Sequence, residues 1–215
     1  MKVTLIGKSE HPEATCAIAA RNCLGHAEEQ HTLEEDRALI RSIIASGHDS
    51  VLEHASLTFF IQGVSRIMTH QLVRHRLASY EEVSQRYTVR PDDIVIPASF
   101  ASHNDDCAKH MMYTAYQTAI GQGIPPEDAR YLLPEGTTTD IVVTMNAREL
   151  RHFFALRCCN RAQWEIRAVA NEMLRLCKQE APSIFDKAGA PCRYGECPEG
   201  KRSCGHKQLP DGDTL

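Results

Sequence analysis

The chain has 215 residues, a length that suits one ordinary domain able to bury a core without disulfides or bound metal. Its 24 lysines and arginines nearly balance 28 aspartates and glutamates, which leaves a formal charge of −4. This balance argues against a whole-domain electrostatic grip on nucleic acid, which usually shows as a strongly basic surface. We therefore expect no nucleic-acid partner, while a local cationic pocket for a small phosphate ligand remains compatible with the composition.

The sequence also indicates a compartment. It contains no run of about 18 apolar residues, so we expect no transmembrane helix and no membrane partner. The strand-like segment Met1–Gly7 is too short for the apolar region of a secretory signal. The nine cysteines are then best interpreted as reduced thiols or metal ligands in a cytoplasmic protein.

The first part of the chain carries clear signals for strands and helices. Thr32 followed by Glu35 has the capping-box spacing that starts a helix, and Gly47 is placed to end it. Apolar residues alternate from 54 to 62 as in a half-buried strand, which Gly63 is expected to break. The predicted elements are, in order, a strand at 3–6, helices at 12–23 and from Thr32 to Gly47, a strand at 54–62, and a helix from Val64 to about Arg76 that places Gln71 and Arg74 on one face.

The second part is bounded by a change of composition near its end. Pro91 and Pro97 bracket a short extended piece, and a β-branched run predicts a strand at 138–145. From Pro191 onward apolar periodicity disappears, so we predict one domain at 1–190 and a Cys-rich tail at 191–215. The predicted elements are an extended piece at 94–96, helices at 100–122 and 126–133, the strand at 138–145, and helices at 147–157 and 161–180.

The segment from Arg74 to Tyr87 is a block of polar groups with little that could build a core. It holds three arginines, a histidine, two serines, two glutamates and a glutamine. Arginine pairs with phosphates and planar carbonyl edges through its fork of donors and keeps its charge at every physiological pH. The block is typical of a site for an anionic, planar ligand, although a solvated charged loop has the same composition.

Within this block the pattern Arg-His-Arg-x-x-Ser-x-x-x-x-Ser-x-Arg is similar to the signature of the flavin-dependent thymidylate synthases, the ThyX family. The resemblance continues through several further segments in the family's order and spacing, over about residues 20–180. These segments are Ser46–His54, Asn146–Arg148, Leu156–Arg157 and Ala162–Ile166.

The resemblance implies a fold and a reaction. The fold would be α/β (α+β), a central, mostly antiparallel sheet flanked by helices, in a homotetramer with shared active sites. The reaction would be the methylation of dUMP to dTMP, with 5,10-methylenetetrahydrofolate as carbon donor, NADPH as reductant and FAD carrying the hydride.

The resemblance also implies site residues, with Arg157 as the catalytic cation against the uracil, where negative charge develops. Departures from the family pattern occur at Glu81 and His152, where the family often has asparagine. His48 and Glu53 would lie close by. The implied flavin contacts are Ser50, Arg74, His75, Arg76, Glu82, Asn146, Arg148 and His152. The implied nucleotide contacts are Gln71, Leu72, Val73, Arg74, Glu82, Val83, Ser84, Gln85, Arg86, Arg130 and Arg157.

Several alternatives concern the cysteines. Cys158 and Cys159 directly follow Arg157, so a nucleophilic thiol is conceivable, but a helical cysteine near Leu156 is more often part of a core. Three tail thiols and an imidazole could close a zinc site, although their spacing fits no common zinc pattern. A small zinc-dependent nucleotide- or nucleic-acid-binding protein is the competing hypothesis, and an inactive relative of the family is a third. The tail residues concerned are Cys192, Cys197, Cys204 and His206.

Overall fold

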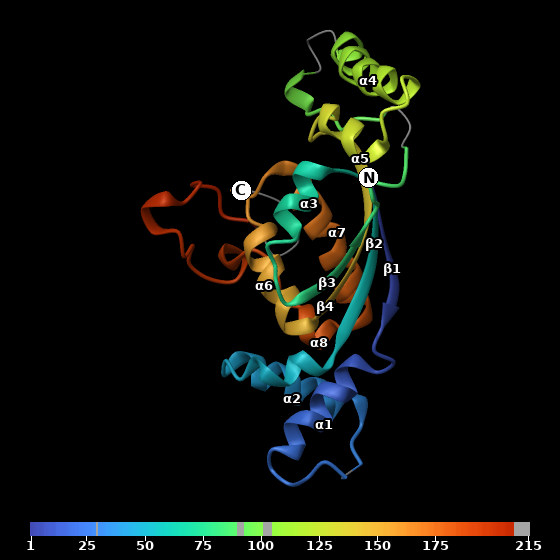
Figure 1. Cartoon of the computed structure of the whole chain (residues 1–215). Coiled ribbons are helices and arrows are strands. Elements are labelled where there is room, and N and C mark those ends of the chain that lie inside the picture. The colour runs from blue at the N-terminus through green and yellow to red at the C-terminus, as the bar shows by residue number, and fades with distance from the viewer. Residues whose placement is uncertain (29, 90–92, 101–104, 209–215) are drawn as a thin grey trace. The chain divides into compact units, whose positions relative to one another are not determined.

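The computed structural model describes residues 1–28, 30–89, 93–100 and 105–208, without the side chains of 105–110 and 112 (Figure 1). None of the helices in these ranges is long and apolar enough to cross a membrane. The strands are β1 (Lys2–Lys8), β2 (Ser56–Ser65), β3 (Ala78–Glu82) and β4 (Thr138–Asn146). The α-helices are α1 (Pro12–Asn22), α2 (Leu33–Ala45), α3 (Arg66–Leu72), α4 (Asp105–Gly121), α5 (Pro126–Ala129), α6 (Ala147–Arg157), α7 (Trp164–Glu180) and α8 (Pro182–Phe185). Five short 3-10 helices complete the described ranges: η1 (Asp49–His54), η2 (Ala98–Phe100), η3 (Arg130–Leu132), η4 (Pro191–Arg193) and η5 (Gly200–Arg202).

The four strands form one antiparallel sheet in the order β1-β2-β4-β3. Helices α6, α7 and α8 lie on one face of this sheet, and the two long strands β2 and β4 run side by side at its centre (Figure 1). The α+β class and the mostly antiparallel sheet expected from the sequence are therefore confirmed.

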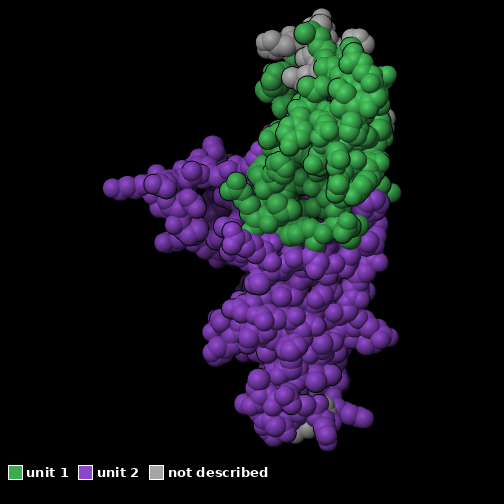
Figure 2. Space-filling view, in the orientation of Figure 1, with its two compact units in different colours: residues 1–2, 61–74, 80–142 green, residues 3–60, 75–79, 143–215 purple. Residues whose placement is uncertain are grey.

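The chain divides into two compact units, drawn in different colours in Figure 2. Unit 1 comprises residues 1–2, 61–74 and 80–142, and unit 2 comprises residues 3–60, 75–79 and 143–215. Each unit has its own buried residues and its own part of the predicted site.

Unit 2 contains the larger core. The rings of Phe153 and Phe154 on α6 are fully buried with centroids 5.5 Å apart, and Phe185 of α8 packs edge-on to Phe154 at 6.0 Å. Helix α7 presents one buried stripe to this core, as its periodicity predicted. Burial of these aromatic groups fixes the long axis of α6, the helix that carries most of the site in this unit.

Unit 1 has a smaller core between α4 and α5. Tyr113, Tyr116, Ala119 and Ala129 are buried together, and the two tyrosine rings lie 5.6 Å apart. This cluster fixes the start of η3, where Arg130 follows Ala129 directly.

Most predicted elements are confirmed, including the capping box of α2. Thr32 accepts a hydrogen bond from the Glu35 backbone N–H, and the Glu35 carboxylate accepts one from the Thr32 N–H. The predicted helix at 126–133 is shorter than expected, because α5 is followed by the 3-10 turn η3. Pro91, the residues 101–104 of the predicted helix at 100–122 and the tail beyond 208 lie outside the described residues.

Two predictions for the segment around the polar block are wrong. Strand β2 does not break at Gly63 but continues to Ser65, since Gly63 takes a φ of +64° and donates its N–H to the Asp140 carboxylate at 2.9 Å. The following helix ends at Leu72, so Arg74 lies beyond it and shares no helix face with Gln71. Part of the polar block, for which the sequence predicted no strand or helix, is strand β3 at an edge of the sheet.

Replacing the Asp140 carboxylate tests how β2 passes through Gly63. We expect Asp140→Ala to lower the free energy of unfolding by about 1–2 kcal/mol, because the Gly63 N–H loses its acceptor. Asp140→Asn keeps an oxygen acceptor and should lose less than half as much. Urea unfolding followed by Trp164 fluorescence measures both, and equal losses would contradict the assignment.

Candidate active site

The unit 2 part of the site is built at the junction where β4 runs directly into α6. Asn146 ends the strand and caps the helix, since its side-chain oxygen accepts a hydrogen bond from the Glu149 N–H at 2.8 Å. The Ala147 N–H donates to the Ala55 carbonyl at 2.8 Å and fastens the first turn to the end of η1. The exposed side chains of Arg148 and His152 follow one turn apart, so one face of the helix presents both.

A buried hydrogen-bonded chain lies behind this face. The Nδ1 of His75 is 2.9 Å from a carboxylate oxygen of Glu149, and the Nε of Arg157 donates to the Nε2 of His75 at 3.1 Å. Burial lowers the pKa of His75; the hydrogen bond to Glu149 opposes this and Arg157 reinforces it, with a net pKa below the usual value. The imidazole is therefore neutral at physiological pH and is held at both nitrogens.

His75, Glu149 and His152 also place three potential ligand atoms within 4.8 Å of one another. Both nitrogens of His75 already face protein groups, and one of those groups is the Arg157 guanidinium. A cation at this point would meet that positive charge. His75 and Glu149 are better described as parts of a hydrogen-bonded relay, Glu149–His75–Arg157, than as ligands of a metal centre.

Two cavities in unit 2 open beside the relay. One of about 570 Å³ is lined in part by Asn146, Arg148, Glu149 and His152. The other, of about 540 Å³, is lined in part by Ser50 and by Cys23. Residues Asp49 and Arg148 line both cavities, so the two are neighbours, and together they are called the unit 2 groove.

The lining of this groove suits a long ligand that is polar at intervals. Arg148 forms an ion pair with Glu53, and both side chains are about half exposed. One carboxylate oxygen of Asp49 is buried with no hydrogen-bond partner among the described residues. A buried acceptor without a donor is costly, and a hydroxyl or ring N–H of a ligand would satisfy it. The donor set and the unpaired acceptor fit a flavin dinucleotide.

The unit 1 part of the site gathers around Glu127. Arg86 donates from Nε to the Glu127 carboxylate at 2.6 Å, and Arg130 donates from Nε to the Glu127 backbone carbonyl at 3.0 Å. The Ser84 hydroxyl accepts from the Arg86 N–H at 3.2 Å, which shapes the turn after β3. Glu127 thereby holds two guanidinium groups, the kind of donor that a phosphate site requires.

Other predicted residues of unit 1 lie on α3 or contact it. Glu82 accepts from the Thr69 hydroxyl at 2.9 Å and forms an ion pair with Arg66 at 3.4 Å. The Leu72 carbonyl accepts from the Tyr80 hydroxyl at 2.9 Å, which ties β3 to the helix end.

The predicted site residues thus fall into two sets. Arg76 is exposed, Gln85 is half-buried in the turn, and the Val83 N–H pairs with the Asp140 carbonyl. Unit 2 holds Ser50, His75, Arg76, Asn146, Arg148, His152 and Arg157, while unit 1 holds Gln71, Leu72, Val73, Arg74, Glu82, Val83, Ser84, Gln85, Arg86 and Arg130.

The sequence reasoning missed two carboxylates. Glu149 stands three residues after Asn146, a spacing that predicts a helix start. This spacing gives no indication that the Glu149 carboxylate contacts His75. Glu127 occurs in the first turn of α5, where acidic residues are common for helix-dipole reasons. Only the fold brings each carboxylate to its partner.

The thiols next to Arg157 differ in environment. Cys158 is fully buried, and burial raises its pKa to about 12. A thiol with so high a pKa holds almost no thiolate at neutral pH and is a poor nucleophile. The structure therefore disfavours Cys158 as a catalytic residue.

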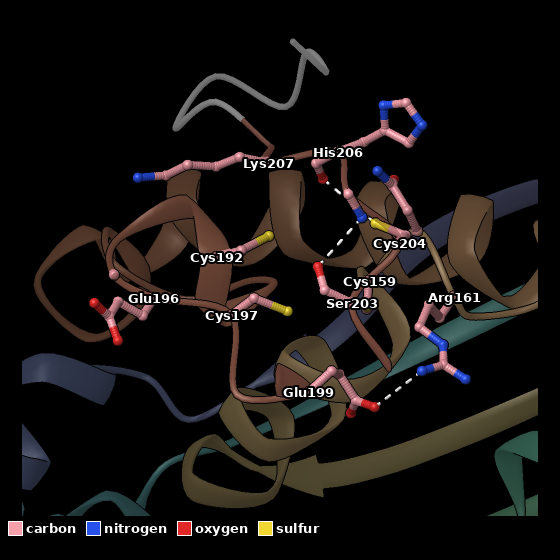
Figure 3. A pocket seen from close by; sticks show the side chains of 13 residues that line it. Cys159, Arg161, Cys192, Glu196, Cys197, Glu199, Ser203, Cys204, His206 and Lys207 are labelled. Carbon is pink, nitrogen blue, oxygen red and sulfur yellow. Dashed lines mark hydrogen bonds and ion pairs between the residues drawn. The ribbon is translucent and has the colours of Figure 1, made fainter. Parts of the chain in front are cut away.

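The tail thiols line a separate cavity of about 330 Å³ in unit 2, together with Cys159 (Figure 3). The imidazole of His206 points away from the sulfur atoms of Cys192 and Cys197 (Figure 3). The one group of three potential ligand atoms within 4.8 Å found in the described ranges is that of His75, Glu149 and His152, and it includes no tail thiol. The geometry therefore gives the predicted tail zinc no support.

Alkylation separates a buried structural thiol from a reactive one. In native protein at pH 7.5 we expect Cys158 to react with iodoacetamide at least a hundredfold more slowly than in urea-unfolded protein, because burial suppresses its thiolate. Peptide mass spectrometry after timed quenching measures the two rates. Similar rates in both states would restore the nucleophile hypothesis.

Comparisons with known proteins give the family of this chain. A family model described as "Thymidylate synthase complementing protein" matches residues 4–183. The flavin-dependent thymidylate synthase of Geobacter sulfurreducens is 49% identical, with 95% of this chain and 94% of the relative covered. The enzyme of the same name from Nitratidesulfovibrio vulgaris is 46% identical, covering 82% and 78%.

A solved structure shares the fold as well. The UMP/dUMP methylase PolB from Streptomyces cacaoi, bound with 5-Br dUMP, superposes with a TM-score of 0.78 at 27% identity, covering 86% of this chain and 92% of the other. The match of the family model to most of the chain, together with relatives of this identity, shows that this chain belongs to the flavin-dependent thymidylate synthase family.

Proposed function

We propose that this protein methylates dUMP to dTMP, using FAD as cofactor, 5,10-methylenetetrahydrofolate as carbon donor and NADPH as reductant. The observation that carries the proposal is Arg157, held by the buried His75 in a family whose named activity is thymidylate synthesis. PolB, which binds a brominated dUMP, supports a uracil nucleotide as the substrate class.

FAD would lie in the unit 2 groove. Arg148 and Ser50 line this groove and offer a guanidinium and a hydroxyl, while Asp49 offers an unpaired acceptor. His152 and Asn146 line its second cavity. We also assign His75, Arg74, Arg76 and Glu82 to flavin contacts from the family pattern. Bound FAD would supply the hydride that completes the methyl group.

The nucleotide would be held by the unit 1 residues through its phosphate. Arg86 and Arg130 are both held by Glu127, and the Ser84 hydroxyl lies at the Arg86 backbone, so two cations and a hydroxyl would share a phosphate's charge. The other unit 1 contacts proposed are Gln71, Leu72, Val73, Arg74, Glu82, Val83 and Gln85.

Arg157 would orient the uracil and stabilise the negative charge that develops on it. A cation fixed in advance needs no rearrangement when charge appears, which makes it an effective catalyst. The hydrogen bond to His75 provides that fixation, because it engages Nε and so restrains the plane of the guanidinium.

We further propose a homotetramer with shared active sites in the cytoplasm, and a single catalytic domain at 1–190 followed by the tail. Light scattering of the purified protein tests the assembly.

One spectroscopic titration tests the core of the proposal. The purified protein should bind FAD in a folded sample, and dUMP should change the absorbance of the bound flavin. UMP added in parallel tests whether the ribonucleotide is also accepted. A folded protein that binds no flavin, or a flavin spectrum unchanged by dUMP, would sink the proposal.

Substituting Arg86 tests the phosphate assignment. We expect Arg86→Ala to weaken dUMP binding at least tenfold, since a guanidinium–phosphate pair is lost. Arg175→Ala is the matched control, because each arginine forms a 2.6 Å ion pair with a glutamate and has a side chain 53% exposed. Flavin-monitored titration gives both dissociation constants, and equal effects would refute the assignment.

A further inference from the structure

We propose that Glu149 is a positioning residue that fixes His75 in one tautomer and thereby holds the guanidinium of Arg157 in place. The inference deepens the function proposed above, since its kinetic consequence rests on Arg157 acting on the nucleotide. The geometric part rests on the structure alone. The Glu149 carboxylate would act through His75 and not on the reacting atoms.

The direction of the hydrogen bonds assigns the tautomer. Arginine has no acceptor, so the Nε of Arg157 must donate, and the His75 Nε2 at 3.1 Å must present its lone pair. The neutral imidazole then carries its proton on Nδ1, which points at the Glu149 carboxylate 2.9 Å away. A carboxylate accepts this proton without ambiguity, and the opposite tautomer would set two donors against each other at Nε2.

Burial protects this arrangement from exchange with water. The side chains of His75 and Glu149 are 4% and 9% exposed, so bulk water does not readily replace either partner. The ring of Phe153 packs edge-on to His75 at 5.0 Å and blocks rotation of the imidazole. The backbone of Glu149 is itself fixed by the Asn146 cap at 2.8 Å. The β4–α6 junction therefore fixes Glu149, Glu149 fixes His75, and His75 fixes the guanidinium of Arg157.

The charged groups around His75 determine how the relay responds when the pH falls. The titratable and charged groups that influence it are Glu149, Arg157 and His152. Protonation would place a proton on Nε2, facing the Arg157 Nε–H, and the guanidinium would lose its acceptor. The relay therefore requires neutral His75 and should fail as pH falls through the pKa of His75.

Removing the Glu149 charge gives a signed prediction. Glu149 raises the pKa of His75 against the larger effect of burial, so Glu149→Gln should lower it further. The glutamine oxygen can still accept the Nδ1 proton and keep the tautomer. We expect the acid limb of kcat/KM for dUMP to move to lower pH, because this limb reports the ionisation of the free enzyme.

Glu149→Ala removes the acceptor altogether. We expect a drop in kcat/KM of about tenfold to a hundredfold at pH 8, the range typical of losing a carboxylate behind a functional histidine. Glu149→Gln should recover much of that loss. Glu165→Gln is the matched control: its side chain is also buried in the first turn of a helix, α7, and it is not among the groups that shift the pKa of His75. It should leave the acid limb where it is.

A spectroscopic measurement separates the relay from the proposed reaction. In protein labelled with ¹⁵N-histidine, the His75 signal, identified by its loss in His75→Gln, should show the proton on Nδ1 and titrate at lower pH in Glu149→Gln. A proton on Nε2, or an acid limb that stays or rises in Glu149→Gln, would overturn the inference. If no dTMP forms at all, the proposed function fails while the ¹⁵N spectra still decide the relay.

Discussion

The junction between β4 and α6 is the constraint on which the rest of unit 2 depends. At this point the chain changes from a central strand to a helix without a loop, and the Asn146 side chain satisfies the helix N-terminus. Because β4 is held between β2 and β3, the start of α6 has no freedom to shift. The groups on the first two turns of α6 are therefore held in fixed positions. They include Arg148 in the groove and Glu149 behind His75.

The charged groups of unit 1 are held near one another by exposed contacts instead of a buried relay. Glu127 holds them by accepting from Arg86 through its carboxylate and from Arg130 through its backbone. These contacts are exposed and therefore exchange readily with solvent or with a ligand anion. The two units thus hold arginines in opposite ways: Arg157 by a buried neutral ring, Arg86 by an exposed ion pair.

Much of this could be predicted from the sequence, for identifiable reasons. The capping box at Thr32 and the β-branched run of β4 are local signals, and the helix and strand that they predicted are confirmed. The predicted strand break at Gly63 was wrong, because a glycine can either end a strand or continue it in a left-handed conformation. Only the hydrogen bond to Asp140 across the sheet decides between the two. Contacts such as that of Glu149 with His75 join residues 74 positions apart, which no local pattern encodes.

Strand β3 has a consequence for how this sequence can change. Along it, exposed and half-buried side chains alternate, so Glu82 points to the same side as Tyr80 and opposite to Glu81. Inserting or deleting one residue between Ala78 and Glu82 would turn every later side chain to the other face. The fixed spacing of the arginine–serine signature therefore follows from the register of strand β3. A change of length in this segment would turn its side chains to the wrong face, whatever residues it carried.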